Sequence, residues 1–374
     1  MEHVRLPDIQ MTFTEDGAVF LRSGSSGIGA KAPPFVTAIL AMCSSPMSRE
    51  TIGERLGPAA AQAYDQLVEL GLLTTVESAG ETPVIFGNYA GIEVHRRMLM
   101  DDVRTELYRQ GLCSVIQPGD VVIDAGSGTG ILATMAAIAG ARKVYAIEKT
   151  DMARVIHAVA KASGVGDVVE VIQGDISKVQ VPEKARVIVH ELFGAWALAE
   201  GFMPNLSRCA ENNLTEDGVL VPGCITLWLA PLREAPPILL HPFRRRSHGL
   251  DLTPLLPEAR SRASLLFANE NHVGTPARVA DLHLPCRGVF SAEIELEGPC
   301  EALVGWFDLQ LAPKVSLPTG PLDPDTHWRQ SVIPLSLPPG RHRIRVHGGP
   351  DPGDFSSLMV TFDGDGIRQD VCFR

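Results

Sequence analysis

An apolar segment followed by three closely spaced glycines constrains this chain more than any other part of its sequence. Residues 121–132, V-V-I-D-A-G-S-G-T-G-I-L, begin as a buried strand that ends at Asp124. Gly126, Gly128 and Gly130 then form the turn into an alanine-rich, helix-like stretch. Glycine is needed in such a turn because the backbone must adopt positive φ and come close to a ligand. We therefore predict an open α/β sheet with a ligand-binding edge at this turn.

Two more predicted strands end in carboxylates at the same sheet edge. K-V-Y-A-I-E ends at Glu148, 22 residues beyond Gly126, and V-V-E-V-I-Q-G-D brings Asp175 to a third strand end. Ligands of open α/β sheets bind at the carboxyl ends of the strands, where an acid can hold both hydroxyls of a ribose. The spacing D-x-G-x-G-x-G differs from the G-x-G-x-x-G of dinucleotide folds and resembles class I methyltransferases, which favours S-adenosylmethionine (SAM).

A second notable segment, residues 187–203, carries two carboxylates and no lysine or arginine. The carboxylates are Glu191 and Glu200, on either side of a chain break expected at Gly194. Two neighbouring carboxylates repel each other, which raises the pKa of at least one unless a cation lies between them. The segment alone leaves two explanations open: a pair of surface acids on a loop, or a site for a bound cation.

Size and composition are those of a soluble globular protein with two or three domains. The chain has 374 residues, of which 45% are hydrophobic and 21% charged. It has no apolar run long enough for a membrane span and no secretion signal at its start. The seven cysteines are scattered without a C-x-x-C pair, which argues against disulfides and a zinc site. We expect a cytoplasmic protein without metal or membrane partner.

The formal charge of −11 argues against nucleic acid as a partner, because phosphate binding depends on basic patches. The same charge is compatible with a cationic substrate that is attracted to an acidic cleft. Arginine far outnumbers lysine, and alanine, glycine and proline are abundant, which is typical of a high-GC bacterial source.

Residues 1–80 are expected to form a small front domain. The pattern predicts, in order, a hairpin at 11–14 and 18–22, helices at 32–42, 49–56 and 58–71, and a wing at 72–77. This order resembles a winged helix, in particular the small domains related to PqqD that bind leader peptides. The third helix has no lysine or arginine, whereas a recognition helix in a DNA groove needs basic or amide side chains. A peptide dock and a structural cover for the next domain both stay open.

From Tyr89 onward the chain resembles the protein arginine methyltransferase family. The matching motifs are Y-A-x5-H-x2-M-L-x-D-x-V-R-T (89–105), D-A-G-S-G-T-G-I-L (124–132), E-x8-E (191–200), G-W-F-D (305–308), T-G-P (319–321) and T-H-W-R-Q (326–330). Glycine-loop methyltransferases in general have neither E-x8-E nor T-H-W. The resemblance implies an α/β + β architecture: a winged-helix-like domain (1–80), a Rossmann-like SAM methyltransferase domain (81–222) and a C-terminal β-barrel (223–374).

The resemblance also implies a homodimer. Residues 234–265, approximately, occupy the place of the family's dimerisation arm, and their apolar runs P-P-I-L-L and L-T-P-L-L suit burial against another subunit. The remainder after residue 223 consists of short alternating runs, which independently predict antiparallel β structure.

SAM is the implied cofactor, with S-adenosyl-L-homocysteine as its product. Arg104 would bind the SAM carboxylate, because a guanidinium fork matches a carboxylate in two places. Glu148 would hold the ribose and Asp175 the adenine, while Ser177 replaces a glutamate that often serves adenine. The complete implied cofactor set is Phe86, His95, Met98, Arg104, Asp124, Gly126, Gly128, Gly130, Glu148, Asp175 and Ser177.

Glu191 and Glu200 are implied to grip the substrate guanidinium, and Asp101 and His327 to form a hydrogen-bonded pair at the mouth of the pocket. Further substrate contacts are implied for Tyr89, Trp196 and Trp328. Plainer roles stay open for three residues. His327 could be a buried structural histidine, Asp101 a helix-surface acid and Met98 a core residue. The pocket walls depart from the family at Leu192, Phe193 and Ala195, which stand where it usually has Trp, Met and Tyr.

These expectations predict a SAM-dependent arginine N-methyltransferase that modifies a terminal guanidino nitrogen. The peptide-binding character of the front domain and the altered walls suggest a bacterial biosynthetic enzyme that acts on free L-arginine or a peptide arginine, and we slightly favour the free amino acid. Methylation of protein arginine stays open as an alternative, and so does a non-catalytic scaffold that only binds peptides.

Overall fold

In the computed structural model the chain divides into two compact units, residues 1–94 and 95–374. Each unit is described by itself. The structure describes residues 2–5, 9–13, 18–23, 29–43, 46–75, 91–244, 246–247, 250–351 and 354–373.

The front unit contains the predicted hairpin and three helices. Its two small antiparallel sheets have the strand orders β5-β1-β6 and β2-β3-β4. The strands are β1 (Glu2–Arg5), β2 (Ile9–Phe13), β3 (Val19–Ser23), β4 (Gly29–Ala32), β5 (Met47–Ser48) and β6 (Leu73–Thr75), and the helices are α1 (Val36–Met42), α2 (Arg49–Leu56) and α3 (Pro58–Glu69). The first helix begins later than predicted because residues 29–32 form a strand and Pro33 and Pro34 follow it.

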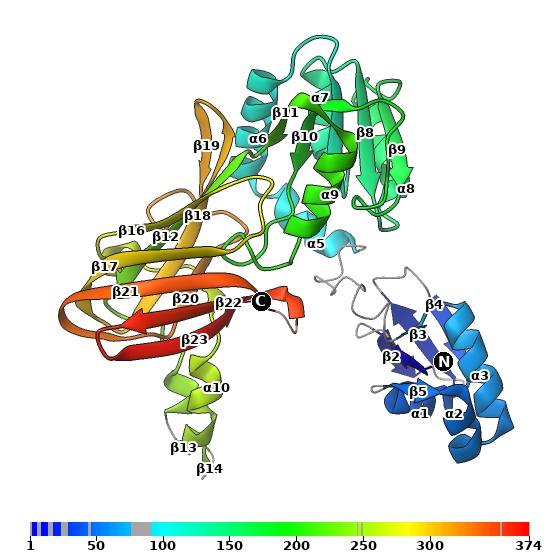
Figure 1. Cartoon of the computed structure of the whole chain (residues 1–374), viewed down its shortest axis with the longest axis horizontal. Coiled ribbons are helices and arrows are strands. Elements are labelled where there is room, and N and C mark those ends of the chain that lie inside the picture. The colour runs from blue at the N-terminus through cyan, green and yellow to red at the C-terminus, as the bar shows by residue number, and fades with distance from the viewer. Residues whose placement is uncertain are drawn as a thin grey trace. The chain divides into compact units, whose positions relative to one another are not determined.

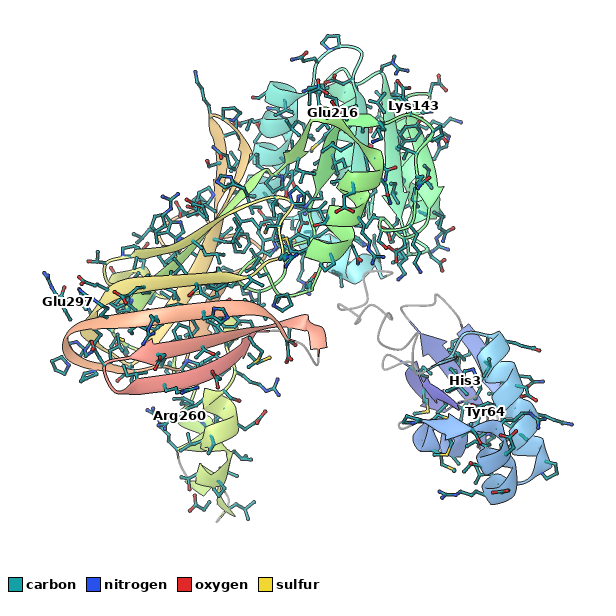
Figure 2. The ribbon with its side chains drawn as sticks, viewed as in Figure 1. His3, Tyr64, Lys143, Glu216, Arg260 and Glu297 are labelled. Atoms are coloured by element: carbon teal, nitrogen blue, oxygen red, sulfur yellow. The ribbon has the colours of Figure 1, made fainter. Side chains whose placement is uncertain are left out.

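Local signals explain the remaining helix boundaries of this unit. The Ser48 hydroxyl accepts a hydrogen bond from the Thr51 amide, and Gly57 ends α2, as the sequence predicts. Tyr64 on α3 donates its hydroxyl to the Met47 carbonyl at 2.8 Å and lies 2.9 Å from His3 Nδ1 (Figure 2). Of the predicted wing, the described residues form β6, which pairs with β1 at the start of the chain, and residues 76 and 77 lie outside the described residues.

A five-stranded parallel sheet forms the first layer of the second unit (Figure 1). Its order is β11-β10-β7-β8-β9, with β7 (Val121–Ala125) fully buried at the centre. The other strands and the helices that pack with them are β8 (Lys143–Glu148), β9 (Val169–Gln173), β10 (Ala185–His190), β11 (Leu214–Val221), α7 (Ile131–Ile138), α8 (Ala153–Ala162) and α9 (Met203–Asn213). The chain order reverses between β7 and β10, and such a switch point is where open sheets bind ligands.

Two helices precede the glycine turn. They are α5 (Ile92–Leu99) and α6 (Asp102–Val115). Asp101 lies between them and caps α6, because its carboxylate accepts the Arg104 amide at 2.9 Å. An aspartate at this position satisfies a backbone donor that the first helical turn leaves unpaired.

The C-terminal part of the second unit consists of two antiparallel sheets of barrel type. One has the order β15-β20-β18-β12-β16 with β19 paired to β18, and the other β17-β21-β22-β23. The strands are β12 (Cys224–Leu232), β15 (Ser264–Leu266), β16 (Ala277–His283), β17 (Phe290–Cys300), β18 (Ala302–Ala312), β19 (Val315–Pro318), β20 (Gln330–Ile333), β21 (Leu337–Asp351), β22 (Asp354–Gly364) and β23 (Ile367–Phe373). One continuous hydrophobic core joins these sheets to the parallel sheet.

The predicted arm separates β12 from β15. Its short elements are η1 (His241–Phe243), β13 (Arg246–Ser247), β14 (Leu250–Asp251), η2 (Thr253–Leu255) and α10 (Leu256–Arg260). Large apolar side chains stay exposed on it, among them Ile238 and Leu250. Among the residues that the structure describes, no helix has the length and apolar character needed to cross a membrane.

Candidate active site

The three glycines after β7 have the backbone that their sequence predicts. Gly126, Gly128 and Gly130 have φ of 78°, 55° and 82°. A Cβ on Gly126 would lie 2.6 Å from Leu192 Cδ2, and one on Gly128 would lie 2.8 Å from His95 Cε1. The turn is therefore held between the acidic segment and α5, and a larger residue at either position would displace one of them.

Glu148 holds this turn from the neighbouring strand. Its Oε2 accepts the Gly128 amide at 2.8 Å and its Oε1 the Thr150 amide at 2.7 Å, while the residue is 6% exposed. An ionised carboxylate has about four lone-pair sites, so lone pairs are left for the hydroxyls of a ribose.

Asp124 contributes a buried carboxyl group beside the turn. Burial raises the pKa of Asp124 to about 7, against the hydrogen bonds that its Oδ2 accepts from the Ser127 hydroxyl and the Ala133 amide. Its Oδ1 is buried and has no hydrogen-bond partner within the described ranges. A buried oxygen without a partner is costly, so this atom fits a donor group of a bound cofactor.

At the end of the next strand, Asp175 and Ser177 act together. Asp175 Oδ1 accepts both the amide and the hydroxyl of Ser177, and Lys149 Nζ lies 3.5 Å from Oδ2. Burial raises the pKa of Asp175, but the hydrogen bonds from Ser177 and the nearby lysines outweigh it and lower the pKa overall. Ser177 thus orients the acid that we predict to meet adenine.

The predicted SAM and guanidinium subsites meet in one buried ion pair. Arg104 Nη1 donates to Glu191 Oε2 at 2.5 Å, and the two side chains are 5% and 9% exposed. Arg104 Nε is buried and, among the described residues, has no hydrogen-bond partner. This orphaned donor fits a ligand carboxylate, which is the role that the resemblance implies for Arg104.

Glu200 ends a tightly folded loop. Gly194 and Ala197 form an isolated β-bridge, and the Ala199 amide donates to the Ala195 carbonyl at 3.1 Å. Glu200 has φ of 92°, and a Cβ on Gly194 would lie 2.5 Å from its Cγ. Because Glu191 is only three residues before Gly194, a span of at most about 10 Å, the fold keeps both carboxylates near the same end of the loop.

Asp101 and His327 form the pair that the sequence predicts. Asp101 Oδ2 accepts the His327 amide at 2.8 Å, and His327 Nδ1 lies 2.9 Å from the same oxygen. Burial raises the pKa of Asp101, but the hydrogen bonds from His327 and the Arg104 amide outweigh it and leave the pKa below its usual range. The contact joins the start of α6 to the T-H-W segment that precedes β20.

Two predicted substrate contacts lie elsewhere. Trp196 is 1% exposed inside the barrel, and its indole N–H donates to the carbonyls of Trp228 and Trp306. Trp328 is 5% exposed, and its indole N–H donates to the Phe193 carbonyl at 2.8 Å. Both indoles anchor the acidic loop rather than line an open pocket.

The remaining predicted residues divide into those that the structure describes and those that it does not. His95 is buried against Gly128, and Met98 is half-buried on α5. Phe86 and Tyr89 lie outside the described residues. Within the described ranges, no three His, Cys, Asp or Glu side chains are grouped as metal ligands.

Sequence reasoning missed two residues beside Glu191. The Tyr108 hydroxyl donates to the His190 carbonyl at 3.0 Å, and Tyr108 lies one helical turn after Arg104, a spacing that could have revealed it. His190 is fully buried against Phe193 and Phe202, with ring centroids 5.2 and 6.0 Å away. Burial lowers the pKa of His190 to about 3, so this histidine stays neutral beside the site.

Two protein-family models match the second unit. Residues 97–221 match a family described as PRMT5 arginine-N-methyltransferase, and residues 276–338 match the arginine methyltransferase oligomerization subdomain. Neither match reaches residues 1–94, so the resemblance of the front unit to PqqD-related domains and the bacterial source stay predictions.

Relatives and solved structures agree with these matches. Protein arginine N-methyltransferase PRMT10 of Oryza sativa subsp. japonica is 31% identical over 297 residues, which cover 68% of this chain and 78% of that protein. Probable protein arginine N-methyltransferase 6 of Arabidopsis thaliana is 27% identical over 332 residues, which cover 72% and 75%. The Trypanosoma brucei PRMT1 enzyme-prozyme complex with AdoHcy has a TM-score of 0.70 at 26% identity and covers 76% of this chain and 99% of that one.

Proposed function

From its membership of the protein arginine methyltransferase family, which makes this chain a SAM-dependent arginine methyltransferase, we propose that it methylates a terminal guanidino nitrogen of free L-arginine or of a peptide arginine. The observation that carries the proposal is the buried Arg104–Glu191 pair, which lies at the switch point of the parallel sheet. There Arg104 Nε is buried and, among the described residues, has no hydrogen-bond partner, which suits the carboxylate of a ligand, while Glu191 belongs to the acidic loop.

The chemistry requires alignment more than a strong base. A guanidinium has a pKa above about 12, so no side chain removes its proton beforehand. Glu191 and Glu200 bind the substrate guanidinium by charge-assisted hydrogen bonds, shift its positive charge away from one terminal nitrogen and aim that nitrogen's lone pair. SAM, when bound, supplies a methyl group on a positively charged sulfur. The nitrogen gains the methyl group and loses one proton, which Glu200 or the Asp101–His327 pair accepts.

Arg104 has a second task in this scheme. Because its Nη1 donates to Glu191 Oε2, it fixes the direction of that carboxylate. The remaining lone pairs of Glu191 stay available to a substrate guanidinium. One arginine of the chain thus connects the cofactor's carboxylate to the substrate's clamp.

A methylation assay tests the proposal. Purified protein with SAM is given free arginine, arginine-containing peptides or a cell lysate, and the products are read by mass for one or two added methyl groups. We expect transfer by the wild type and at least a hundredfold loss when both glutamates are replaced by glutamine. Full transfer by that double variant, with SAM still bound, would contradict the mechanism.

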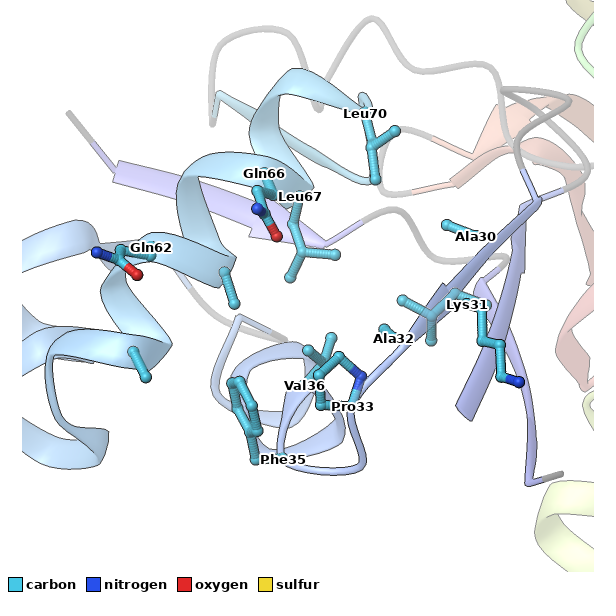
Figure 3. A pocket seen from close by; sticks show the side chains of 13 residues that line it. Ala30, Lys31, Ala32, Pro33, Phe35, Val36, Gln62, Gln66, Leu67 and Leu70 are labelled. Carbon is cyan, nitrogen blue, oxygen red and sulfur yellow. The ribbon is translucent and has the colours of Figure 1, made fainter. Parts of the chain in front are cut away.

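A groove in the front unit favours a peptide over the free amino acid. It lies between β4 and α3 and is lined by Leu21, Ala30, Lys31, Ala32, Pro33, Phe35, Val36, Ala59, Gln62, Ala63, Gln66, Leu67 and Leu70 (Figure 3). Within the described residues β4 pairs with β3 alone, so its other edge can add an extended strand. Phe35 and Leu70 are 44% and 40% exposed, which suits apolar side chains of such a peptide.

The two acceptors are distinguished in the same assay. If the groove delivers the acceptor, a Leu70→Glu variant raises the KM for a peptide and leaves the KM for free L-arginine unchanged. Transfer to L-arginine alone, unaffected by this variant, would support the free amino acid. A non-catalytic scaffold is disfavoured because Arg104, Glu191 and Glu200 are all retained, and failure to bind SAM in a calorimetric titration would restore it.

We also propose that the arm joins two copies of the chain. Ile238, Leu250 and Leu255 are 67%, 65% and 49% exposed, which is unusual for large apolar side chains in one segment. The match to the oligomerization subdomain supports a homodimer. An Ile238→Glu, Leu250→Glu variant should sediment as a monomer, and an unchanged dimer would reject this role for the arm.

A further inference from the structure

We propose that Trp196 is a positioning residue for the methyl transfer. Its indole is inserted into a socket of the barrel, and this contact holds the acidic loop, residues 191–200, in the shape that aims Glu200. The proposal rests on the proposed function, because it assigns the two carboxylates to the substrate guanidinium.

The socket binds the indole by two hydrogen bonds. Trp196 Nε1 donates to the Trp228 carbonyl at 3.2 Å and to the Trp306 carbonyl at 3.0 Å. These carbonyls belong to directly paired residues of β12 and β18. The single indole donor therefore ties the loop to two adjacent strands of the barrel.

Ring contacts complete the socket. The indole stacks on Phe373 of β23, with centroids 5.2 Å apart and planes at 20°, and meets Phe290 of β17 edge-on at 5.7 Å. A Cβ on Gly305 would lie 3.1 Å from Nε1. Glycine at this point of β18 allows the indole to approach the strand, and a side chain there would push it outward.

The loop has a conformation that it would not keep without support. Trp196, Ala197 and Glu200 have φ of 46°, 61° and 92°, all in a region that residues with a side chain avoid. Such residues persist only where their surroundings hold them. Trp328 supports the loop at the Phe193 carbonyl, and the anchored indole is the largest side chain among residues 194–199, whose other members are three alanines, a glycine and Leu198.

Backbone hydrogen bonds carry this support to Glu200. The Leu198 amide donates to the Trp196 carbonyl at 2.8 Å, and the Ala199 amide to the Ala195 carbonyl at 3.1 Å. Glu200 follows directly, with its Cγ against Gly194. Glu191 is held differently, by Arg104, so loss of the indole contact should disturb Glu200 more than Glu191.

A double-mutant cycle between Trp196→Phe and Gly305→Ala tests this role. Trp196→Phe keeps an aromatic ring and removes the N–H. Gly305→Ala changes only the barrel strand and displaces the indole, while the sequence of the loop stays the same. Each is expected to lower kcat/KM for the arginine acceptor about tenfold and to change the Kd for SAM less than twofold. Because both act through one contact, the double variant should lose far less than the product of the two effects.

Phe362→Leu is the matched control, since Phe362 is a fully buried ring of β22 outside the socket. It is expected to lower the thermal midpoint without lowering kcat/KM of the folded enzyme. A purely structural role for Trp196 predicts the same behaviour for Trp196→Phe. That outcome, or independent multiplication of the two losses in the cycle, would overturn the proposal.

Hydrogen exchange provides a readout that does not depend on activity. In Trp196→Phe the amides of Leu198 and Ala199 should exchange at least tenfold faster than in the wild type, while the amides of β7 keep their rates. In the control variant Phe362→Leu the amides of Leu198 and Ala199 should exchange as in the wild type. Unchanged exchange of these amides would reject the anchor. If the wild type transfers no methyl group but Trp196→Phe still shows the faster exchange, the proposed function is rejected and the anchor stays in place.

Discussion

The two carboxylates of the acidic loop depend on different parts of the molecule. Glu191 continues from β10 of the parallel sheet and is fixed by a buried arginine of α6. Glu200 is half-buried, has a left-handed backbone and depends on an indole inserted into the barrel. The proposed guanidinium clamp is thus assembled from two layers of the fold, and each layer can be weakened separately.

Replacement of the two glutamates should have the largest effects, and the free energy of unfolding should distinguish the two variants. Glu191→Gln and Glu200→Gln should each lower kcat at least about a hundredfold. Glu191→Gln should also lower the free energy of unfolding by about 3 kcal/mol, because it leaves the Arg104 guanidinium buried without its charge partner. Glu200→Gln should change it by less than about 1 kcal/mol. Urea unfolding of both variants measures this difference, and equal destabilisation would show that the two supports are not distinct.

Arg104→Lys should separate cofactor binding from clamp geometry. A lysine cannot reproduce the fork of a guanidinium, so contacts to both Glu191 and the cofactor carboxylate weaken. Charge-assisted hydrogen bonds contribute about 1.5–3 kcal/mol, which corresponds to a roughly 10–150-fold rise in the Kd for SAM. Calorimetric titration measures this Kd, and Trp196→Phe is the control that should bind SAM as the wild type does. A normal Kd in Arg104→Lys would remove Arg104 from the cofactor site.

His190 provides a pH test of the sheet side of the clamp. Burial lowers its pKa to about 3, so below pH 6.5 the unfolded chain binds a proton that the folded chain excludes. Stability therefore rises with pH across the window from about 3 to 6.5, and acidification costs on the order of 1 kcal/mol per pH unit. Thermal unfolding between pH 7 and pH 5 should show this slope, and His190→Leu should flatten it. An equal slope in both proteins would show that His190 is protonated in the folded state.

The smallest effect concerns Asp101, which joins the two supports. Asp101→Ala removes both the cap of α6 and the contact with His327, and should lower the free energy of unfolding by about 1–2 kcal/mol. Asp101→Asn keeps a capping oxygen and should lose less. The pKa of Asp101 is lowered in the folded state, so its ionised form stabilises above the ordinary aspartate range and this contribution is lost as pH falls through the lowered value. The stability difference between wild type and Asp101→Asn should therefore shrink in acid, and a constant difference would argue against the charge.

The sequence predicted the parts of the site that local rules determine. Three glycines with positive φ, an acid at the end of β8 and the E-x8-E spacing are local patterns, and each was recognisable by its spacing. Asp101 was predicted only as the partner of His327, and its second role as the cap of α6 needed the structure. The pairing of Arg104 with Glu191 spans 87 residues and needed the fold.

Trp196 shows most clearly why the remainder could not be predicted. An aromatic residue in a predicted pocket loop suggests a substrate contact, and its burial follows from residues 32 and 110 positions later in the chain. Those residues bind it through their backbone carbonyls, which leave no trace in residue type. Gly305 was noticed only as part of a motif, and its value lies in the missing side chain.

The stacking of Trp196 on Phe373 has a consequence for how the protein is made. The two rings are separated by 177 residues. Phe373 lies on β23, which is the last in sequence of the four strands of its sheet. The parallel sheet can form during synthesis while this partner is still missing, because domains generally fold from the N-terminal side as they emerge. Contacts of such large sequence separation also form slowly. A nascent chain should therefore acquire its cofactor site before its clamp, with an interval in which SAM is held and arginine is not.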